Sequence, residues 1–442
     1  MSEKINEYLQ RGPATSKEIQ AATGLSQAAV SRRLRSMGDR VIRVREGRAI
    51  LYAVTRNAFG GTDKLPLSRV DPQGNIMLIA FLRPLAHGGF FLEPSEGVSS
   101  LLLGENKQGL YDDLPYFLLD CSPQGFIGRK IALEMASRSD VFPADPKRWT
   151  TEHIGRYLLS NGDDLPGNFT LGEQAMLRVR RKPVPVPDVD YPALAESVIE
   201  GEVPGSSAAG EQPKFTAFSE ERSAHVIVKF SPKGENELAR RWRDILLTEY
   251  HAAQILDEWG YSVAATRLLE AGGRLFLESQ RFDRIGEYGR RNMVSLSSID
   301  AEFVGIGAGW SQVCEALFEQ GLISTEHVHD AECLWLFGKL INNTDMHLGN
   351  ISMAMEGDMF SLLPIYDMCS MGFAPKSGGE VAPYHFVPKK ITGTKFVDQA
   401  ALQRIEEMAY AFWERIAAEE RISDELRVFL GKGNPVGLMI EC

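Results

Sequence analysis

The sequence predicts an α+β protein of several domains that begins with a small basic head. The chain has 442 residues, more than one hydrophobic core usually supports, so we expect two or three domains. Short apolar runs of strand length occur at Ile76–Leu82 and His225–Phe230, whereas Leu238–Leu256 is long enough for a helix. Residues 1–60 carry eleven Lys and Arg against five Asp and Glu, although the whole chain has a net charge of −11.

Composition narrows the class of protein. Hydrophobic residues make up 44% of the chain and charged residues 24%, proportions typical of soluble globular proteins. No apolar run approaches the roughly 18 residues that span a bilayer, and the first ten residues lack the apolar stretch of a signal peptide. The five cysteines are scattered without a Cys-x-x-Cys pair, which favours a reducing compartment over a disulfide framework. We therefore expect a cytoplasmic protein.

The head, residues 1–60, has the element order of a winged helix. An amphipathic helix begins at Ile5, a second is expected over Lys17–Thr23, and Ser26 can cap a third over Gln27–Met37. Apolar and polar residues then alternate on both sides of Glu46-Gly47, which indicates a β-hairpin. A helix, a helix-turn-helix and a basic hairpin in this order predict a winged helix-turn-helix domain.

The basic residues of the head suggest DNA as its partner. Four residues of the third helix share one face, and Gln and Arg can pair with base edges while Ser contacts base or phosphate. The arginines of the hairpin would reach phosphates or the minor groove. The alternative is a winged helix used for protein contacts or dimerisation. The seven candidates are Gln27, Ser31, Arg32, Arg35, Arg43, Arg45 and Arg48.

The remaining chain divides into three parts by composition. Residues 61–185 read as a β-rich region with helices near Phe126–Ala136 and Thr151–Leu159, ending in a semi-extended, proline-rich connector. Residues 186–294 read as an α+β segment and residues 295–442 as a helix-rich tail.

A loop of small residues, Gly205–Lys214, precedes the strand His225–Phe230. Small residues let backbone N–H groups approach phosphate oxygens, although Gly210 is followed by Glu211 and Gln212 and not by the Lys-Ser/Thr of a Walker A loop. By itself this segment is weak evidence, and an ordinary surface loop is the more common reading of such a sequence.

Lys229 lies in that strand between apolar neighbours. A half-buried amine needs a carboxylate or phosphate partner, and Glu249 in the following helix is the candidate carboxylate. In kinases such a lysine contacts the ATP phosphates and is positioned by a helix glutamate. The alternative is a solvent-facing lysine on an edge strand.

Acidic and amide side chains follow in the second half of the chain. Asp345 and Asn350 are five residues apart, the spacing that separates the base Asp from the metal-binding Asn in a protein-kinase catalytic loop. His347 would orient this loop. Asp367 ends an apolar strand, and a hairpin around Gly357 would return it to Asn350, where a second Mg²⁺ ligand belongs. Each motif alone fits an ordinary turn, but their common order favours phosphoryl transfer from ATP.

At this point the sequence resembles the HipA family of bacterial serine/threonine kinases, the toxins of toxin–antitoxin pairs. The resemblance covers about residues 65–430. Its most specific parts are the Arg-Phe-Asp-Arg run at 281–284 and the Asp-x-His-x-x-Asn loop at 345–350. It implies a two-lobed kinase-like fold with a β-rich N-lobe and a helical C-lobe, and Mg²⁺-bound ATP between them.

The resemblance also assigns roles to single residues. Asp345 would be the catalytic base, assisted by His347, and Asn350 and Asp367 would hold Mg²⁺. Ser207 would be an autophosphorylation site, with Ser206 as an adjacent alternative. The residues expected around ATP are Ser207, Ala209, Gly210, Gln212, Lys214, Lys229, Glu249 and Phe282.

Partners follow from the resemblance as well. It implies a protein substrate in translation, such as an aminoacyl-tRNA synthetase. It also implies an antitoxin, yet the family's DNA-binding activity normally resides in that separate protein, whereas here a winged helix is attached to the chain. Arrangements with and without a separate antitoxin therefore stay open. Glu211 and Pro213 depart from the family's loop pattern.

Two other functions compete with an active kinase. The first is a DNA-binding transcriptional regulator whose kinase fold only senses nucleotide; retention of Lys229, Asp345, Asn350 and Asp367 argues against it. The second is a metal-dependent nuclease that cleaves the DNA held by the head.

Overall fold

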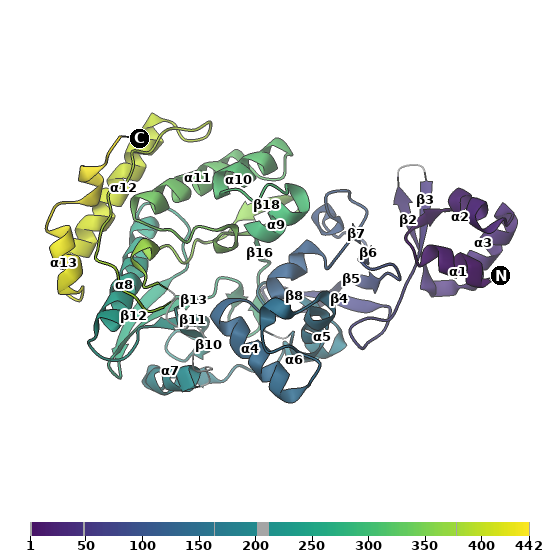
Figure 1. Cartoon of the computed structure of the whole chain (residues 1–442), viewed down its shortest axis with the longest axis horizontal. Helices are drawn as coiled ribbons and strands as arrows, with labels where there is room; N and C mark the ends of the chain where they lie inside the picture. The colour runs from purple at the N-terminus through teal and green to yellow at the C-terminus, as the bar shows by residue number, and fades with distance from the viewer. Residues whose placement is uncertain (1, 47–48, 163, 201–211, 377, 442) are drawn as a thin grey trace.

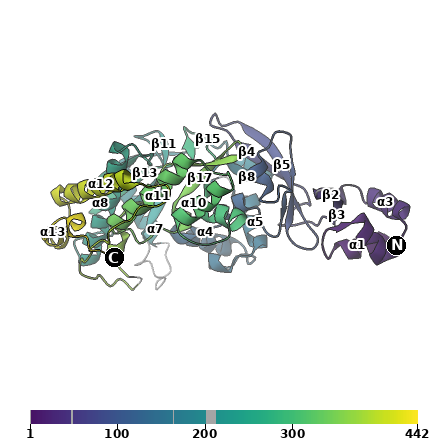
Figure 2. The same cartoon turned by 90° about the horizontal axis from the view of Figure 1, so that it is seen from above.

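The computed structural model describes residues 2–46, 49–162, 164–200, 212–376 and 378–441. The molecule is elongated, with the head at one end and the larger body at the other (Figures 1 and 2). Among the described residues, no helix combines the length and the apolar character needed to cross a membrane.

The head contains three helices and a three-stranded sheet in the order β1-β3-β2. Its third helix ends at Ser36, one residue before the predicted end, and the two hairpin strands flank Gly47 as predicted. Apolar side chains at helical spacing, including Ile5, Ile19 and Val30, are fully buried between the helices and the sheet. The elements are α1 (Ser2–Leu9), β1 (Ala14–Thr15), α2 (Ser16–Thr23), α3 (Gln27–Ser36), β2 (Val41–Glu46) and β3 (Ala49–Val54).

Local signals explain the helix-turn-helix. Thr15 and Glu18 form a capping box that satisfies backbone N–H groups at the start of α2. Gly24 ends the same helix with φ 68°, a left-handed conformation that favours glycine. Ser26 then accepts a hydrogen bond from the backbone N–H of Ala29 and begins α3.

The middle region forms a five-stranded sheet in the order β7-β6-β5-β4-β8, with helices beside it. The predicted strand at 76–82 and the predicted helices at 126–136 and 151–159 are all present with slightly different ends. The elements are β4 (Leu65–Val70), β5 (Ile76–Pro84), β6 (Phe90–Pro94), β7 (Leu110–Tyr111), α4 (Gly125–Arg138), α5 (Thr151–Asn161), β8 (Phe169–Leu171) and α6 (Glu173–Arg178).

Arg83 connects this sheet to the head. Its guanidinium is 3% exposed and donates to the backbone oxygens of Asp39 and Asp63 at 2.6 and 2.8 Å. Beside it, Ile42 and Val44 of β2 pack against Leu85 in a separate small apolar core. The head therefore contacts the middle region through buried polar and apolar groups.

The body begins with a second five-stranded sheet, in the order β12-β13-β11-β10-β9, and the long helix α8 beside it. The proline-rich connector contributes the edge strand β9, so the predicted boundary at 185/186 divides a strand. The elements are β9 (Pro185–Val186), α7 (Tyr191–Glu200), β10 (Lys214–Ser219), β11 (Ala224–Phe230), α8 (Glu237–Glu258), β12 (Thr266–Ala271), β13 (Arg274–Gln280), β14 (Arg284–Ile285) and β15 (Gly289–Arg290).

The rest of the body is mainly helical and includes one small sheet of β16, β17 and β18. The predicted boundary at 294/295 divides β16, which pairs with β17. Trp310, Phe337 and Trp413 are buried between the helices. The elements are β16 (Val294–Ser295), α9 (Leu296–Phe303), α10 (Trp310–Glu319), α11 (Thr325–Leu340), β17 (Ser352–Glu356), β18 (Met359–Leu362), α12 (Gln399–Ala418) and α13 (Asp424–Leu430).

Candidate active site

Lys229 lies at the centre of the site. It sits on β11, between Lys214 of β10 and Leu277 of β13 in the sheet register, and it is 5% exposed. Its ammonium group donates to both carboxylate oxygens of Glu249 at 2.6 and 2.7 Å and also contacts Asp367. The predicted Lys–Glu pair is therefore present, and the predicted metal-binding Asp adjoins it.

Opposing charges set the ionisation of this group. Burial alone would lower the pKa of Lys229, but Asp367 and Glu249 outweigh it and hold the pKa above its ordinary value. Partial burial would raise the pKa of Asp367, but Lys229 and Lys214 reverse the effect and lower this pKa to about 2. Both groups are thus charged at neutral pH, as a phosphate and metal site requires.

Asp367 owes its position to the segment around it. Ile365 exchanges backbone hydrogen bonds with the chain just after α8, donating to Ser262 O and accepting from Ala264 N, both at 2.9 Å. The hydroxyl of Tyr366 donates to the backbone oxygen of Gly349 at 3.0 Å. Asp367 itself has φ 58°, an uncommon conformation for a non-glycine residue that is often found at functional sites.

The loop Asp345–Asn350 follows α11 and is held by its own side chains. The amide nitrogen of Asn350 donates to the backbone oxygen of Asp345 at 2.6 Å, so this hydrogen bond does not use the carbonyl oxygen of the same amide. His347 accepts a hydrogen bond from Gly349 N at 3.0 Å, and its other ring nitrogen lies 3.6 Å from Asp345. His347 thus orders the loop, as predicted.

Asp345 is accessible to a substrate. Its side chain is 47% exposed and that of His347 is 61% exposed, whereas Lys229 and Glu249 are buried. His347 also helps to lower the pKa of Asp367, so the loop lies within electrostatic reach of the buried ion pairs. The charged side chains of Lys229 and Glu249 are buried, and the carboxylate of Asp345 is exposed. Such an arrangement suits a bound nucleotide that reacts with a hydroxyl group of another molecule.

Two sets of residues could hold a metal ion. Glu249, Asp367 and Cys369 have ligand atoms within 4.8 Å of one another, but the ammonium of Lys229 already contacts both acids. Burial also raises the pKa of Cys369 well above its ordinary value, so its thiol stays protonated. Asn350 and Asp367 form the second set, and both offer the oxygen ligands that Mg²⁺ prefers.

Phe282 lies against the site. Its ring centroid is 5.6 Å from that of Tyr366, and its neighbours form a buried ion-pair network. Asp283 accepts hydrogen bonds from Arg281 at 2.9 and 3.0 Å and from Arg284 at 2.7 Å. Sequence analysis identified the Arg-Phe-Asp-Arg run but not this network.

The same network reaches the middle region. Asp164 accepts from Arg281 at 2.8 Å and from Arg284 at 2.9 Å, and Gly167 N donates to Asp283 at 3.0 Å. Nothing in the local sequence around Asp164 marked it for this role, since it lies in an irregular segment more than 100 residues away from Arg281.

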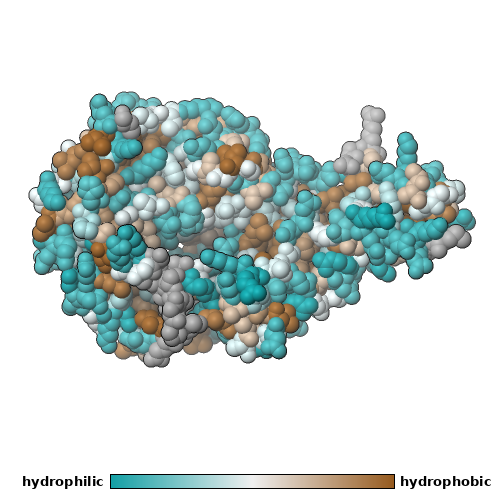
Figure 3. All heavy atoms as spheres, in the orientation of Figure 1, coloured by the Kyte–Doolittle hydropathy of each residue, from teal (hydrophilic) through white to brown (hydrophobic). Residues whose placement is uncertain are grey.

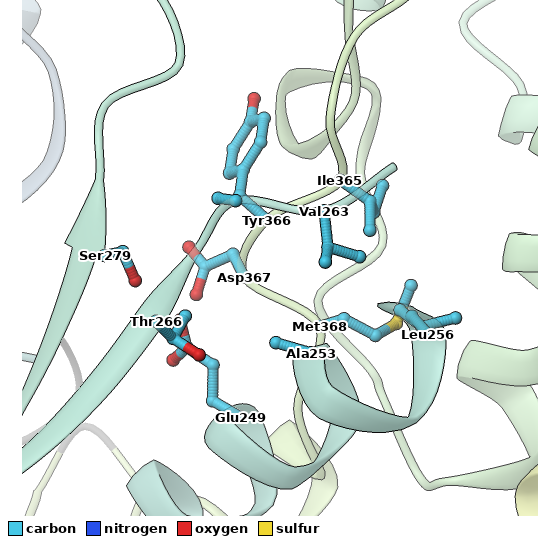
Figure 4. A pocket seen from close by; sticks show the side chains of 11 residues that line it. Glu249, Ala253, Leu256, Val263, Thr266, Ser279, Ile365, Tyr366, Asp367 and Met368 are labelled. Carbon is cyan, nitrogen blue, oxygen red and sulfur yellow. The ribbon is translucent and has the colours of Figure 1, made fainter. Parts of the chain in front are cut away.

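A small pocket lies between α8, β12, β13 and the segment of Asp367 (Figure 4). Glu249, Thr266, Ser279 and Asp367 line one side, and apolar residues line the other. Among the described residues, the hydroxyl of Thr266 is buried and has no hydrogen-bond partner. The pocket extends the site behind the Lys229–Glu249 pair.

Several predicted positions lie outside the described residues: Ser206, Ser207, Ala209 and Gly210 of the small-residue loop and Arg48 of the hairpin. Gln212, Pro213 and Lys214 of the same loop are described. Gln212 is buried, and Lys214 lies on β10 opposite Lys229 and contributes to the lowered pKa of Asp367.

The head presents its predicted polar face to solvent. Gln27, Arg32 and Arg35 on α3 are exposed, as are Arg43 and Arg45 on β2, while Ser31 is half-buried. Arg35 donates to the Ser31 hydroxyl at 3.0 Å. Hydrophilic residues cover most of the visible face of the head (Figure 3).

Parts of the chain match known protein families, and almost the whole chain matches one known protein. Residues 61–180 match the family described as YjjJ-like toxin, middle domain, and residues 206–425 match the HipA-like C-terminal domain. Toxin YjjJ of Escherichia coli (strain K12) is 34% identical over 437 residues, covering 97% of this chain and 95% of the relative.

Two solved structures were also compared. HipA of Shewanella oneidensis MR-1, solved with HipB and operator DNA, has a TM-score of 0.53 at 17% identity and covers 82% of this chain and 91% of that one. It shares the mixed α/β fold. The Helicobacter pylori proinflammatory kinase CtkA has a TM-score of 0.36 at 16% identity and covers 51% of this chain and 92% of that one. This TM-score is too low to establish a shared fold. Because a relative that is 34% identical matches almost the whole chain, the protein belongs to the family of toxin YjjJ, with a HipA-like C-terminal domain at residues 206–425.

Proposed function

We propose that this protein is a serine/threonine protein kinase that transfers the γ-phosphoryl group of ATP in the presence of Mg²⁺. The observation that carries the proposal is the buried contact of Lys229 with both Glu249 and Asp367, beside a loop that presents Asp345, His347 and Asn350. Phosphoryl transfer needs mostly positioning and charge neutralisation, and these groups supply both.

Each residue would perform one part of the reaction. Lys229, held by Glu249, would orient the phosphates through its ammonium group, and Lys214 would add a second positive charge. Asn350 and Asp367 would hold Mg²⁺, which neutralises phosphate charge when bound. Asp345 would accept the proton of the substrate hydroxyl at its carboxylate, with His347 keeping the loop in place. Phe282 and Tyr366 would border the nucleotide.

The direct experiment incubates the purified protein and a cell lysate with γ-labelled ATP. We expect Mg²⁺-dependent label on serine or threonine, lost when EDTA removes the metal. Absence of label on the protein and on every lysate component would instead favour a nucleotide-sensing regulator. Nicking of plasmid DNA without ATP, abolished by Asp345→Ala, would favour a nuclease. We infer a translation component as substrate class, and phosphoproteomics after expression of wild type and Asp345→Asn identifies the target.

We further propose that the head is a winged helix that binds DNA. The supporting observation is the exposed face of α3, with Gln27, Arg32 and Arg35, next to the exposed Arg43 and Arg45 of β2. The Shewanella structure contains a separate HipB and operator DNA. In the present chain the head would contact DNA itself, so purified protein should bind its operator without an antitoxin.

Removal of two arginines tests this interface. Arg32→Ala combined with Arg35→Ala should weaken DNA binding and lower the slope of log affinity against log salt by about 2 if both contact phosphate. The matched control, Lys389→Ala with Lys432→Ala, removes the same charge from exposed positions in the body and should leave binding unchanged. Fluorescence anisotropy at several salt concentrations measures both. Equal affinity of the two double variants would contradict the assignment of α3.

A further inference from the structure

Helix α8 is held in place by residues 419–427, which lie near the C-terminus. Asp244 of α8 is 2% exposed, and its carboxylate accepts hydrogen bonds from both the backbone N–H and the hydroxyl of Ser423, at 2.8 and 2.5 Å. The hydroxyl of Tyr384 donates to the same carboxylate at 2.5 Å. A buried carboxylate with three donors is strongly bound to its surroundings, since losing a donor leaves charge poorly solvated.

A second contact lies two helical turns further along α8. His251 is 8% exposed, and its ring nitrogen Nε2 lies 2.9 Å from a carboxylate oxygen of Glu419. Arg421 donates to both carboxylate oxygens of Glu419 at 2.8 Å, which keeps that side chain in place. Arg240 of α8 also donates to the Glu425 carboxylate at 2.7 Å. The C-terminal segment Glu419–Arg427 therefore contacts α8 at several points along the helix.

The same face of the structure also secures the segment that follows Asp367. Arg241 of α8 is 5% exposed and donates to the backbone oxygens of Phe373 and Ala382, both at 2.8 Å, while its guanidinium lies 3.7 Å from the ring centre of Tyr384. Thr248 accepts from Ser370 N at 3.1 Å. Helix α8 thus links the C-terminal segment to the chain around Asp367.

These contacts bear on the site because α8 also carries Glu249. Glu249 follows Asp244 by five positions. At about 100° per residue, this places the two residues about 140° apart around the helix axis. One side of the helix therefore faces the C-terminal segment while the other reaches Lys229. A helix moves largely as a unit, so a small displacement at Asp244 is passed to Glu249. Hydrogen bonds of 2.6 and 2.7 Å do not tolerate such a shift.

We propose that Ser423 and Asp244 are positioning residues for phosphoryl transfer: the C-terminal segment holds α8 so that Glu249 keeps Lys229 in place. This inference rests on the kinase function proposed above. In protein kinases the corresponding Lys–Glu pair must be formed for activity, and the position of its helix controls it. Here the chain supplies the holding segment itself.

The test uses Ser423→Ala in the full-length protein. The variant loses the hydroxyl that donates to Asp244 and should lower kcat about tenfold, the effect of about 1.4 kcal/mol on a barrier. Ser423→Thr keeps a hydroxyl and should restore kcat. Ser423 caps α13 by accepting from Leu426 N at 3.2 Å. Ser324→Ala is the matched control, since Ser324 caps α11 in the same way, by accepting from His327 N, and makes no hydrogen bond to α8 among the described residues. It should lower the melting temperature without lowering kcat.

A double variant separates positioning from a general loss of stability. Glu249→Gln weakens the same pair, so Ser423→Ala should lower kcat no further in that background, while the two losses in melting temperature should add. Multiplicative losses in kcat, or wild-type kcat in Ser423→Ala, would overturn the inference. Lack of activity in the wild type would overturn the proposed function instead. Hydrogen exchange needs no activity: amides of α8 near Glu249 should exchange faster in Ser423→Ala, and unchanged exchange contradicts the coupling.

Discussion

Asp345→Asn and Asp367→Ala are each expected to reduce phosphotransfer by about a hundred- to ten-thousandfold, the range measured for loss of a catalytic base. Asparagine at 345 keeps the size of the side chain but cannot accept a proton. Alanine at 367 removes the carboxylate proposed to bind Mg²⁺, which is also one of the two acids that contact Lys229. The rate of label transfer from γ-labelled ATP measures the loss.

The fold should survive both changes. Asp345 is half exposed, so its substitution leaves little buried charge unpaired, and Lys229 keeps Glu249 as a partner after Asp367→Ala. The matched control is Glu356→Gln, which neutralises an exposed carboxylate on the nearby β17–β18 hairpin and should retain full activity. Near wild-type activity in either test variant would contradict the roles assigned to these residues.

Asp283→Ala is expected to produce the largest loss of stability, about 3–5 kcal/mol, as when one partner of a buried ion pair is removed. Arg281 and Arg284 would keep only Asp164 of the two carboxylates that they share, while remaining almost inaccessible to water. Ion pairing outweighs burial and holds the pKa of Asp283 below its ordinary value, so the carboxylate is charged in the native protein. Urea unfolding monitored by tryptophan fluorescence measures the change.

An exposed ion pair provides the comparison. Glu380→Ala removes the partner of Lys376, and both side chains are largely exposed, at 68% and 65%, so water solvates the remaining charge and stability should be unchanged within error. If Asp283→Ala unfolds at the same urea concentration as Glu380→Ala, the network at Arg281–Arg284 does not secure the middle region to the body.

The contact of Lys229 with Glu249 was predictable because each residue lies in a regular local pattern. Apolar neighbours in β11 bury Lys229, the long amphipathic helix α8 carries Glu249 to the same sheet, and the turn at Gly357 returns the chain toward Asn350. The order of helices and strands in the head was likewise readable from capping residues and alternation. In each case the signal lies within a few residues of the element that it predicts.

The parts that sequence reasoning missed depend on contacts between distant segments. Asp164 and Arg281 are 117 residues apart, and Asp244 and Ser423 are 179 apart. A lone aspartate or serine in an irregular segment carries no periodic signal for such a contact. The direct contact between Lys229 and Asp367 was missed for a similar reason: spacing suggested a metal ligand, but only the folded chain brings this carboxylate to the ammonium group.

The central claim, that Lys229, Glu249 and Asp367 form one nucleotide site with Asn350, is tested most directly by calorimetric titration with a non-hydrolysable ATP analogue. We expect one analogue to bind per chain in the presence of Mg²⁺, with much weaker binding in EDTA and in Asp367→Ala. Binding that is equally tight without Mg²⁺ and in Asp367→Ala, or no binding by the wild type, would contradict it.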